Sequence, residues 1–216
     1  MKRTDIRQLF AVLLLLAVAD GAWATPAPEQ KAPRLDRFLA TVQTFEAAFR
    51  QRVTLPDGEV TEDSTGTVVM QRPGRFRWNY TAPFERVIVA DGSKLWLYEA
   101  DLDQVTVRRL TSGLGDTPAA LLTGKESVLA KFRVERQWSA EGIAWVRLVP
   151  RSDGSDFAAV SLGFQGDTLR RIQLDDRLGQ ETRIDFSDVK VNRALPEDVF
   201  HFTPPAGADV IDDSDL

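Results

Sequence analysis

The stretch Gly66–Arg109 decides the fold, and it reads GTVVMQRPGRFRWNYTAPFERVIVADGSKLWLYEADLDQVTVRR. Short runs of alternating apolar and polar residues fill it, which is typical of β-strands with one buried face. Breaks rich in Pro, Gly and Asp separate these runs at Arg72-Pro73-Gly74, Thr81-Ala82-Pro83 and Asp91-Gly92. Because such residues form tight turns between adjacent strands, the stretch predicts an antiparallel meander.

One strand of this meander carries an aromatic face. Phe76, Trp78 and Tyr80 follow each other at every second position, so their side chains point to the same side of a strand. The intervening residues are polar and take the other side. We therefore expect a curved sheet whose inner face is lined by bulky aromatic rings.

The second half of the chain returns to strands. Five alternating runs are separated by turn residues, at Phe132–Trp138, Ile143–Val149, Phe157–Phe164, Thr168–Leu174 and Glu181–Phe186. Turns at this spacing indicate an all-β sandwich or barrel. A final strand is expected around Phe200 and Phe202, followed by a solvated acidic tail from Asp209 onward.

A helix is predicted before the meander, starting at Pro33, since proline is favoured in the first turn. Its apolar residues form one helical stripe made of Leu35, Phe38, Leu39, Val42, Phe45 and Phe49. Exposed phenylalanines are costly in water, so the stripe must be covered. Two interpretations stay open: an ordinary amphipathic helix that seals the sheet, and a movable lid over a hydrophobic cavity.

An insert interrupts the strand pattern after Arg109. Asp116-Thr117-Pro118 has the composition of a helix start, Ala119–Leu122 is a short apolar run, and Gly124 ends it. Ser127–Lys131 is expected to add another helical turn. The insert is either a plain crossover connection or a second cover beside the first helix.

Residues 1–24 have the order of a secretory signal peptide: a basic start, an apolar run from Leu9 to Ala19, and Ala22-Trp23-Ala24 as a cleavage site. The run is too short to span a bilayer as a helix. We expect export, cleavage after Ala24 and a mature single domain of residues 25–216. N-terminal sequencing of periplasmic protein should start at Thr25, and an intact N-terminus in a membrane fraction would contradict this prediction.

Composition excludes several function classes. The net charge is −5, and it becomes −6 without the signal peptide, whose own net charge is +1. An acidic chain is a poor partner for nucleic acid or anionic lipid surfaces. There is no cysteine, which excludes thiol catalysis and thiolate metal sites. The one histidine, His201, has no base or nucleophile in view, and no phosphate-binding loop is present. We expect neither enzyme activity nor a cofactor.

Arg72 is the candidate functional residue of the meander. It continues the apolar face of Val68 and Met70 at the same period, and a guanidinium there needs hydrogen-bond acceptors. One interpretation is a strand end that lets the side chain reach water. The other is a latch whose donors bind main-chain oxygens of the covering helices.

A family resemblance rests on an ordered set of motifs: Arg72-Pro73-Gly74-Arg75-Phe76-Arg77-Trp78, Asp91-Gly92 with Leu95-Trp96-Leu97-Tyr98, Asp103-Gln104-Val105, and Phe200-His201-Phe202-Thr203-Pro204-Pro205. Together they resemble the periplasmic outer-membrane lipoprotein carriers of the LolA family. The resemblance implies an incomplete, unclosed antiparallel β-barrel covered by a helical lid. It also favours the lid over the plain helix, and places Arg72 at the family's latch position. Arg77 departs from the pattern.

The resemblance implies a periplasmic chaperone that binds the acyl chains of lipoproteins in a hydrophobic cavity. It would act as a monomer, receive cargo from an inner-membrane ABC-type lipoprotein-releasing complex and pass it to an outer-membrane lipoprotein acceptor. The expected cavity residues are Phe45, Phe49, Phe76, Trp78, Tyr80, Ile88, Leu121 and Leu122.

Two other functions stay open at this point. A lipid-sensing or lipid-scavenging domain would use the same cavity for a different ligand. A hydrolase of acyl lipids would need a nucleophile and a base, and no G-x-S-x-G motif is present.

Overall fold

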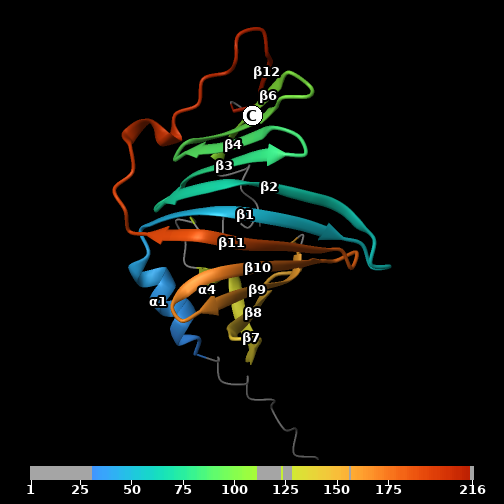
Figure 1. Cartoon of the computed structure of the whole chain (residues 1–216), viewed down its shortest axis with the longest axis vertical. Helices are drawn as coiled ribbons and strands as arrows, with labels where there is room; N and C mark the ends of the chain where they lie inside the picture. The colour runs from blue at the N-terminus through green and yellow to red at the C-terminus, as the bar shows by residue number, and fades with distance from the viewer. Residues whose placement is uncertain (1–30, 111–122, 124–127, 156, 215–216) are drawn as a thin grey trace, which may run out of the picture.

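The computed structural model describes residues 31–110, 123, 128–155 and 157–214. Its strands form one sheet in the order β12-β6-β5-β4-β3-β2-β1-β11-β10-β9-β8-β7 (Figure 1). The strand bounds are β1 Thr44–Thr54, β2 Val60–Gln71, β3 Arg75–Ala82, β4 Arg86–Asp91, β5 Lys94–Glu99, β6 Gln104–Arg109, β7 Phe132–Ala140, β8 Ile143–Pro150, β9 Phe157–Gln165, β10 Thr168–Asp176, β11 Glu181–Val191 and β12 Asp209–Asp212. Adjacent strands are antiparallel except β12, which runs parallel to β6. The two edge strands, β12 and β7, do not pair with each other, so the predicted unclosed antiparallel barrel is confirmed.

The antiparallel order gives the curved sheet two distinct rims. We call one the hairpin rim; it carries the turns that follow β1, β3, β5, β8 and β10, on the right in Figure 1. We call the other the helix rim; it carries the turns that follow β2, β4 and β9, and the helix α1 lies on this side. The strands predicted from alternation in both halves of the chain are confirmed within a few residues.

The first helix is shorter than predicted. α1 spans Pro33–Thr41, and Val42 already has extended backbone angles. The prediction of one helix through Phe49 was therefore wrong, because Phe45 and Phe49 lie in β1. Residues four apart share a face of a strand as well as of a helix. β1 gains backbone hydrogen bonds from β2 and from β11, and this pairing on both sides favours the strand.

The other helical segments are only partly described. The predicted turn near Lys131 is confirmed as α4, Val128–Lys131. The predicted helix at Ala119–Leu122 lies outside the described residues, as does the signal peptide. No helix in the described part of the chain combines the length and the apolar character needed to cross a bilayer.

The C-terminal segment differs from its prediction. Instead of a strand around Phe200, Glu197–Phe200 forms the short 3-10 helix η1, which buries Phe200. Phe202 packs with Trp96 and Tyr98 on the outer face of the sheet, at ring distances of 5.9 and 6.2 Å. The acidic tail, expected to be solvated, pairs its backbone with β6 as β12 while its side chains stay exposed.

The main hydrophobic core sits between the concave face of the sheet and the helix α1. Leu35 and Phe38 of α1 are almost fully buried there, and the Phe38 ring lies 5.8 Å from that of Phe164 in β9. One continuous cluster of buried side chains runs from α1 across both halves of the sheet. The concave face is thus the surface on which the sequence concentrates its apolar side chains.

Candidate functional site

The concave face is most apolar close to the helix rim. Phe45 of β1 pairs with Met70 of β2, which in turn pairs with Phe76 of β3. These side chains are 0%, 1% and 3% exposed, respectively. Their alternation with polar residues along each strand directs all of them to the same side, where they join the buried cluster that also contains Leu35 and Phe38 of α1.

The predicted aromatic residues come together in the middle of this face. The ring of Phe49 lies 5.2 Å from Trp78 and 5.0 Å from Tyr80. Ile88 of β4 stands opposite Trp78 and packs against the core at its edge. Sequence reasoning therefore placed these four residues together correctly, although it put Phe49 on a helix.

Of the remaining predicted cavity residues, Phe45 packs edge-on against Phe186 of β11, with ring centroids 5.2 Å apart. Leu121 and Leu122 lie outside the described residues. Of the predicted lid stripe, Leu35, Phe38 and Leu39 lie on α1, and Val42 follows its end.

Arg72 lies at the helix rim, in the turn between β2 and β3. Its Nη1 donates a hydrogen bond to the main-chain oxygen of Leu39 in α1. Its guanidinium carbon lies 5.4 Å from the centre of the Phe38 ring. Burial lowers the pKa of Arg72. The guanidinium thus connects the sheet to α1, which is the contact that the latch hypothesis requires, while its role in release stays a prediction.

The concave face changes character towards the hairpin rim, where polar side chains replace the apolar ones. The Tyr80 hydroxyl donates to Gln51 Oε1 at 3.1 Å, and Gln51 donates to Glu62 Oε1 at 3.1 Å. Ser64 donates to the same Glu62 oxygen at 2.7 Å. Arg86 lies over the Tyr80 ring at 4.2 Å and pairs with Glu62 at 3.6 Å. Burial raises the pKa of Tyr80, so its hydroxyl stays a donor at neutral pH.

We call these five residues, Gln51, Glu62, Ser64, Tyr80 and Arg86, the polar end. Sequence reasoning missed it. The signal was available, because positions counted in steps of two back from Met70 read Val68, Gly66, Ser64 and Glu62. The face that begins apolar therefore ends polar, and it could present different chemistry to the two ends of an amphipathic ligand.

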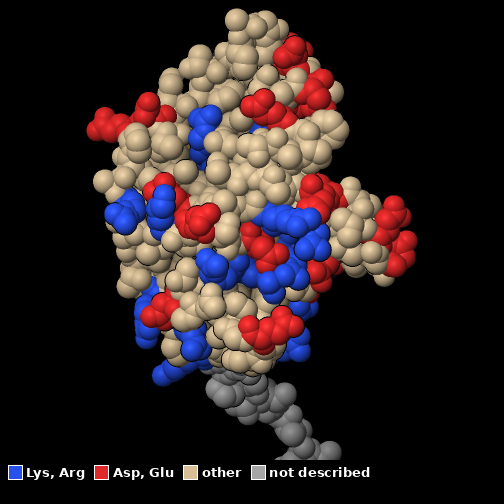
Figure 2. Space-filling view, in the orientation of Figure 1, with Lys and Arg blue, Asp and Glu red and all other residues tan. Residues whose placement is uncertain are grey.

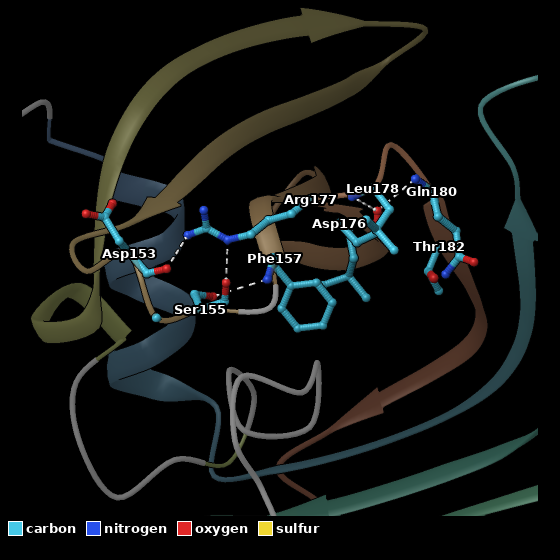
Figure 3. A pocket seen from close by; sticks show the side chains of 10 residues that line it. Asp153, Ser155, Phe157, Asp176, Arg177, Leu178, Gln180 and Thr182 are labelled. Atoms are coloured by element: carbon cyan, nitrogen blue, oxygen red, sulfur yellow. Dashed lines mark hydrogen bonds between the residues drawn. The ribbon is translucent and has the colours of Figure 1, made fainter.

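A pocket of about 590 Å³ opens at the hairpin rim beside the core (Figure 3). Phe157 and Leu174 supply apolar surface to it. Arg177 closes one side, donating to the main-chain oxygens of Ser155 and Asp153, both at 2.7 Å.

The outer face of the sheet is ionic where the concave face is apolar. Basic and acidic side chains intermingle there (Figure 2), as in the pairs Arg50–Asp63 at 2.5 Å and Arg171–Asp185 at 2.5 Å. Although burial opposes it, hydrogen bonds from Arg183 and Arg171 lower the pKa of Asp185. These ions are paired with each other, so this face offers a solvated surface rather than a ligand site.

The residues weighed as catalytic are placed apart. Asp175 pairs with Arg147 at 2.5 Å, while Asp176 accepts main-chain donors of Leu178 and Gln180 within its own turn. His201 is exposed and its ring contacts Thr203 at 3.4 Å. Among the described residues, no three His, Asp or Glu side chains gather as a metal ion would require. Arg77 donates to Asn79 and to the main-chain oxygen of His201, so it helps to attach the C-terminal segment.

Comparison of the sequence with protein families gives one match over most of the chain. Residues 40–203 match the model of the outer membrane lipoprotein carrier protein LolA. An outer-membrane lipoprotein carrier protein of Methylococcus capsulatus is 39% identical over 204 residues, covering 94% of this chain and 98% of that protein. One of Methylibium petroleiphilum is 45% identical over 177 residues, covering 82% of this chain and 87% of that protein.

Solved structures support the fold. An uncharacterised conserved protein of Thermus thermophilus superposes with a TM-score of 0.52 at 17% identity, covering 83% of this chain and 95% of that one. At this identity the likeness concerns the arrangement of the sheet and not the ligand.

Proposed function

Because this chain belongs to the family of the outer membrane lipoprotein carrier protein LolA, we propose that it binds the acyl chains of lipoproteins on its concave face and carries them across the periplasm. Proteins of this family are carriers and not enzymes, and the same holds for this chain. The mature chain, residues 25–216, would act as a single unit and as a monomer.

The observation that carries the proposal is the construction of the concave face. A continuous apolar surface spans both halves of the sheet, and within the described ranges the nine-residue helix α1 packs against it. This helix buries Leu35 and Phe38 in the apolar cluster, and acyl chains can replace such side chains chemically. The apolar surface is therefore suited to bind acyl chains in place of α1.

The free energies make such an exchange reasonable. Hiding acyl chains from water contributes about 0.8 kcal/mol per methylene, so several long chains gain tens of kcal/mol before costs. A carrier that kept this full gain could never release its cargo. Displacing α1 exposes Leu35 and Phe38 and breaks the hydrogen bond of Arg72, and these costs offset part of the gain. Uptake and release then both become possible.

The proposed route starts at an inner-membrane ABC-type lipoprotein-releasing complex and ends at an outer-membrane lipoprotein acceptor. The predicted signal peptide supports a periplasmic location. The chain has no phosphate-binding loop, so the energy for loading would come from the inner-membrane partner.

A release assay tests the proposal. Inner-membrane vesicles containing newly made lipoproteins are incubated with ATP and the purified mature protein. We expect lipoproteins in the supernatant as one-to-one complexes with it, detected by size exclusion and mass spectrometry. Lipoproteins that stay with the vesicles, although the protein is folded, would contradict the proposed function.

The chain offers a control in which the helix cannot move. Arg37 of α1 and Asp167 in the β9–β10 turn form an exposed ion pair at 2.6 Å. Because the chain has no cysteine, Arg37→Cys and Asp167→Cys can be joined by a short thiol cross-linker without side reactions. The cross-linked protein should release no lipoprotein, whereas the same variant without cross-linker should behave like the unmodified protein.

A further inference from the structure

Two hydrogen-bond donors on the concave face have no acceptor among the described residues. They are Nε1 of the Trp78 indole and Nε of the Arg86 guanidinium, and both atoms are buried. Trp78 as a whole is only 5% exposed. A buried donor without an acceptor is costly, so most native structures pair such groups or use them for a ligand.

The two donors lie close to each other in the sheet. Trp78 and Tyr80 are successive residues on the concave face of β3, and Arg86 of β4 stands directly opposite Tyr80. Trp78 is therefore the diagonal neighbour of Arg86. Both lie at the boundary where the apolar face meets the polar end, with the rings of Phe49 and Phe186 packed around Trp78.

The chemistry of the missing partner follows from these groups. An indole N–H and a guanidinium N–H only donate, so they require acceptor oxygens. The acceptor must be uncharged at the Trp78 position, because a carboxylate or phosphate among aromatic rings would lose its hydration. A carbonyl oxygen joined to a long apolar chain meets both conditions.

We propose that Trp78 and Arg86 bind the two ester carbonyls of the cargo's diacylglyceryl group, one carbonyl for each donor. This inference rests on the proposed function and adds an orientation to it. The hydrocarbon chains would run from Trp78 towards Phe45 and Met70 at the helix rim. The glyceryl group and the peptide would lie over the polar end and leave at the hairpin rim.

The test compares two lipopeptides on the same protein. One is a triacylated lipopeptide with two palmitoyl esters; the other has the same chain lengths but two hexadecyl ethers in place of the esters, and keeps the N-palmitoyl amide. Affinities for the unmodified mature protein and for Trp78→Phe are measured by titration calorimetry below the aggregation concentration of the lipopeptides. The ether probe lacks the two ester carbonyl oxygens, and the substitution removes one donor.

We expect the unmodified protein to prefer the ester probe at least about thirtyfold, the combined effect of one neutral hydrogen bond from Trp78 and one charged hydrogen bond from Arg86. Trp78→Phe also loses packing area, which weakens the binding of both probes alike. Its ester preference should fall about fivefold and not vanish, because Arg86 still binds the second carbonyl. Trp96→Phe is the matched control, because the Trp96 indole donates to Asp91 on the outer face, at 3.3 Å. This control should keep the full ester preference.

Other outcomes would overturn the inference. An unmodified protein that binds both probes equally has no ester site, and a Trp78→Phe protein that keeps the full preference does not use the indole. If the unmodified protein bound neither lipopeptide, the proposed function itself would fail, and the release assay would show the same failure independently. Arg86→Met, which keeps the length of the stem, should reduce the ester preference as well.

Discussion

An Arg72→Leu protein is expected to fold and to load cargo, but to hand it over at least about tenfold more slowly than the unmodified protein. The leucine removes the donor that binds the Leu39 oxygen and keeps an apolar side chain against Phe38. A hydrogen bond from a charged group contributes about 1.5–3 kcal/mol. Without this hydrogen bond, the closed cargo-free form of the protein is less stable. Release of the cargo therefore lowers the free energy of the protein by less, and hand-over slows.

The measurement scores loading and hand-over in separate steps. Loading from inner-membrane vesicles should be normal, and transfer to outer-membrane acceptor should be slow. Arg37→Leu is the matched control: it removes an arginine from α1 itself, but its ion pair with Asp167 is exposed and contributes little. Normal hand-over by a well-folded Arg72→Leu protein would reject the latch, and gross unfolding would assign Arg72 a structural role.

Gly66→Ala is expected to lower the free energy of unfolding by more than about 3 kcal/mol, which is a large part of the stability of an ordinary domain. A Cβ at Gly66 would lie 1.9 Å from the main-chain oxygen of Asn79 and 2.9 Å from the Phe49 ring. The first contact is with backbone, which cannot rotate away. Strands β2 and β3 would have to separate at the bulge between Thr65 and Gly66, and the aromatic cluster would separate with them.

The measurement is chemical denaturation of the mature protein. Gly154→Ala is the control, since a Cβ there meets nothing within 4 Å and Gly154 does not have a positive φ. We expect this control to unfold at the same denaturant concentration as the unmodified protein. A Gly66→Ala protein of unchanged stability would mean that the two strands approach less closely than the structure shows.

Much of the fold was predictable because strand patterning is local. Phe76, Trp78 and Tyr80 alternate with polar residues, and turn residues bound their strand, so neither the strand nor its inner face depends on distant segments. The Arg72 prediction likewise came from its place at the end of an apolar strand face. It led to the Leu39 contact that the structure shows.

The spacing of apolar residues gave the wrong secondary structure where one spacing fits both a helix and a strand, or where a turn replaces the strand. Phe45 and Phe49 are four apart, a spacing that suits one face of a helix and one face of a strand equally. Phe200 and Phe202 are two apart and fit a strand, but Phe200 is buried by a 3-10 turn while Phe202 packs on Trp96.

The sequence by itself determined which side of each strand is apolar and where the chain turns, because both depend on neighbouring residues only. Tertiary structure alone decided where α1 ends, since β1 exists through hydrogen bonds to β2 and β11. It also decided which donors find acceptors. The buried indole nitrogen of Trp78 lacks one among the described residues, where the rings of Phe49 and Phe186 pack against it.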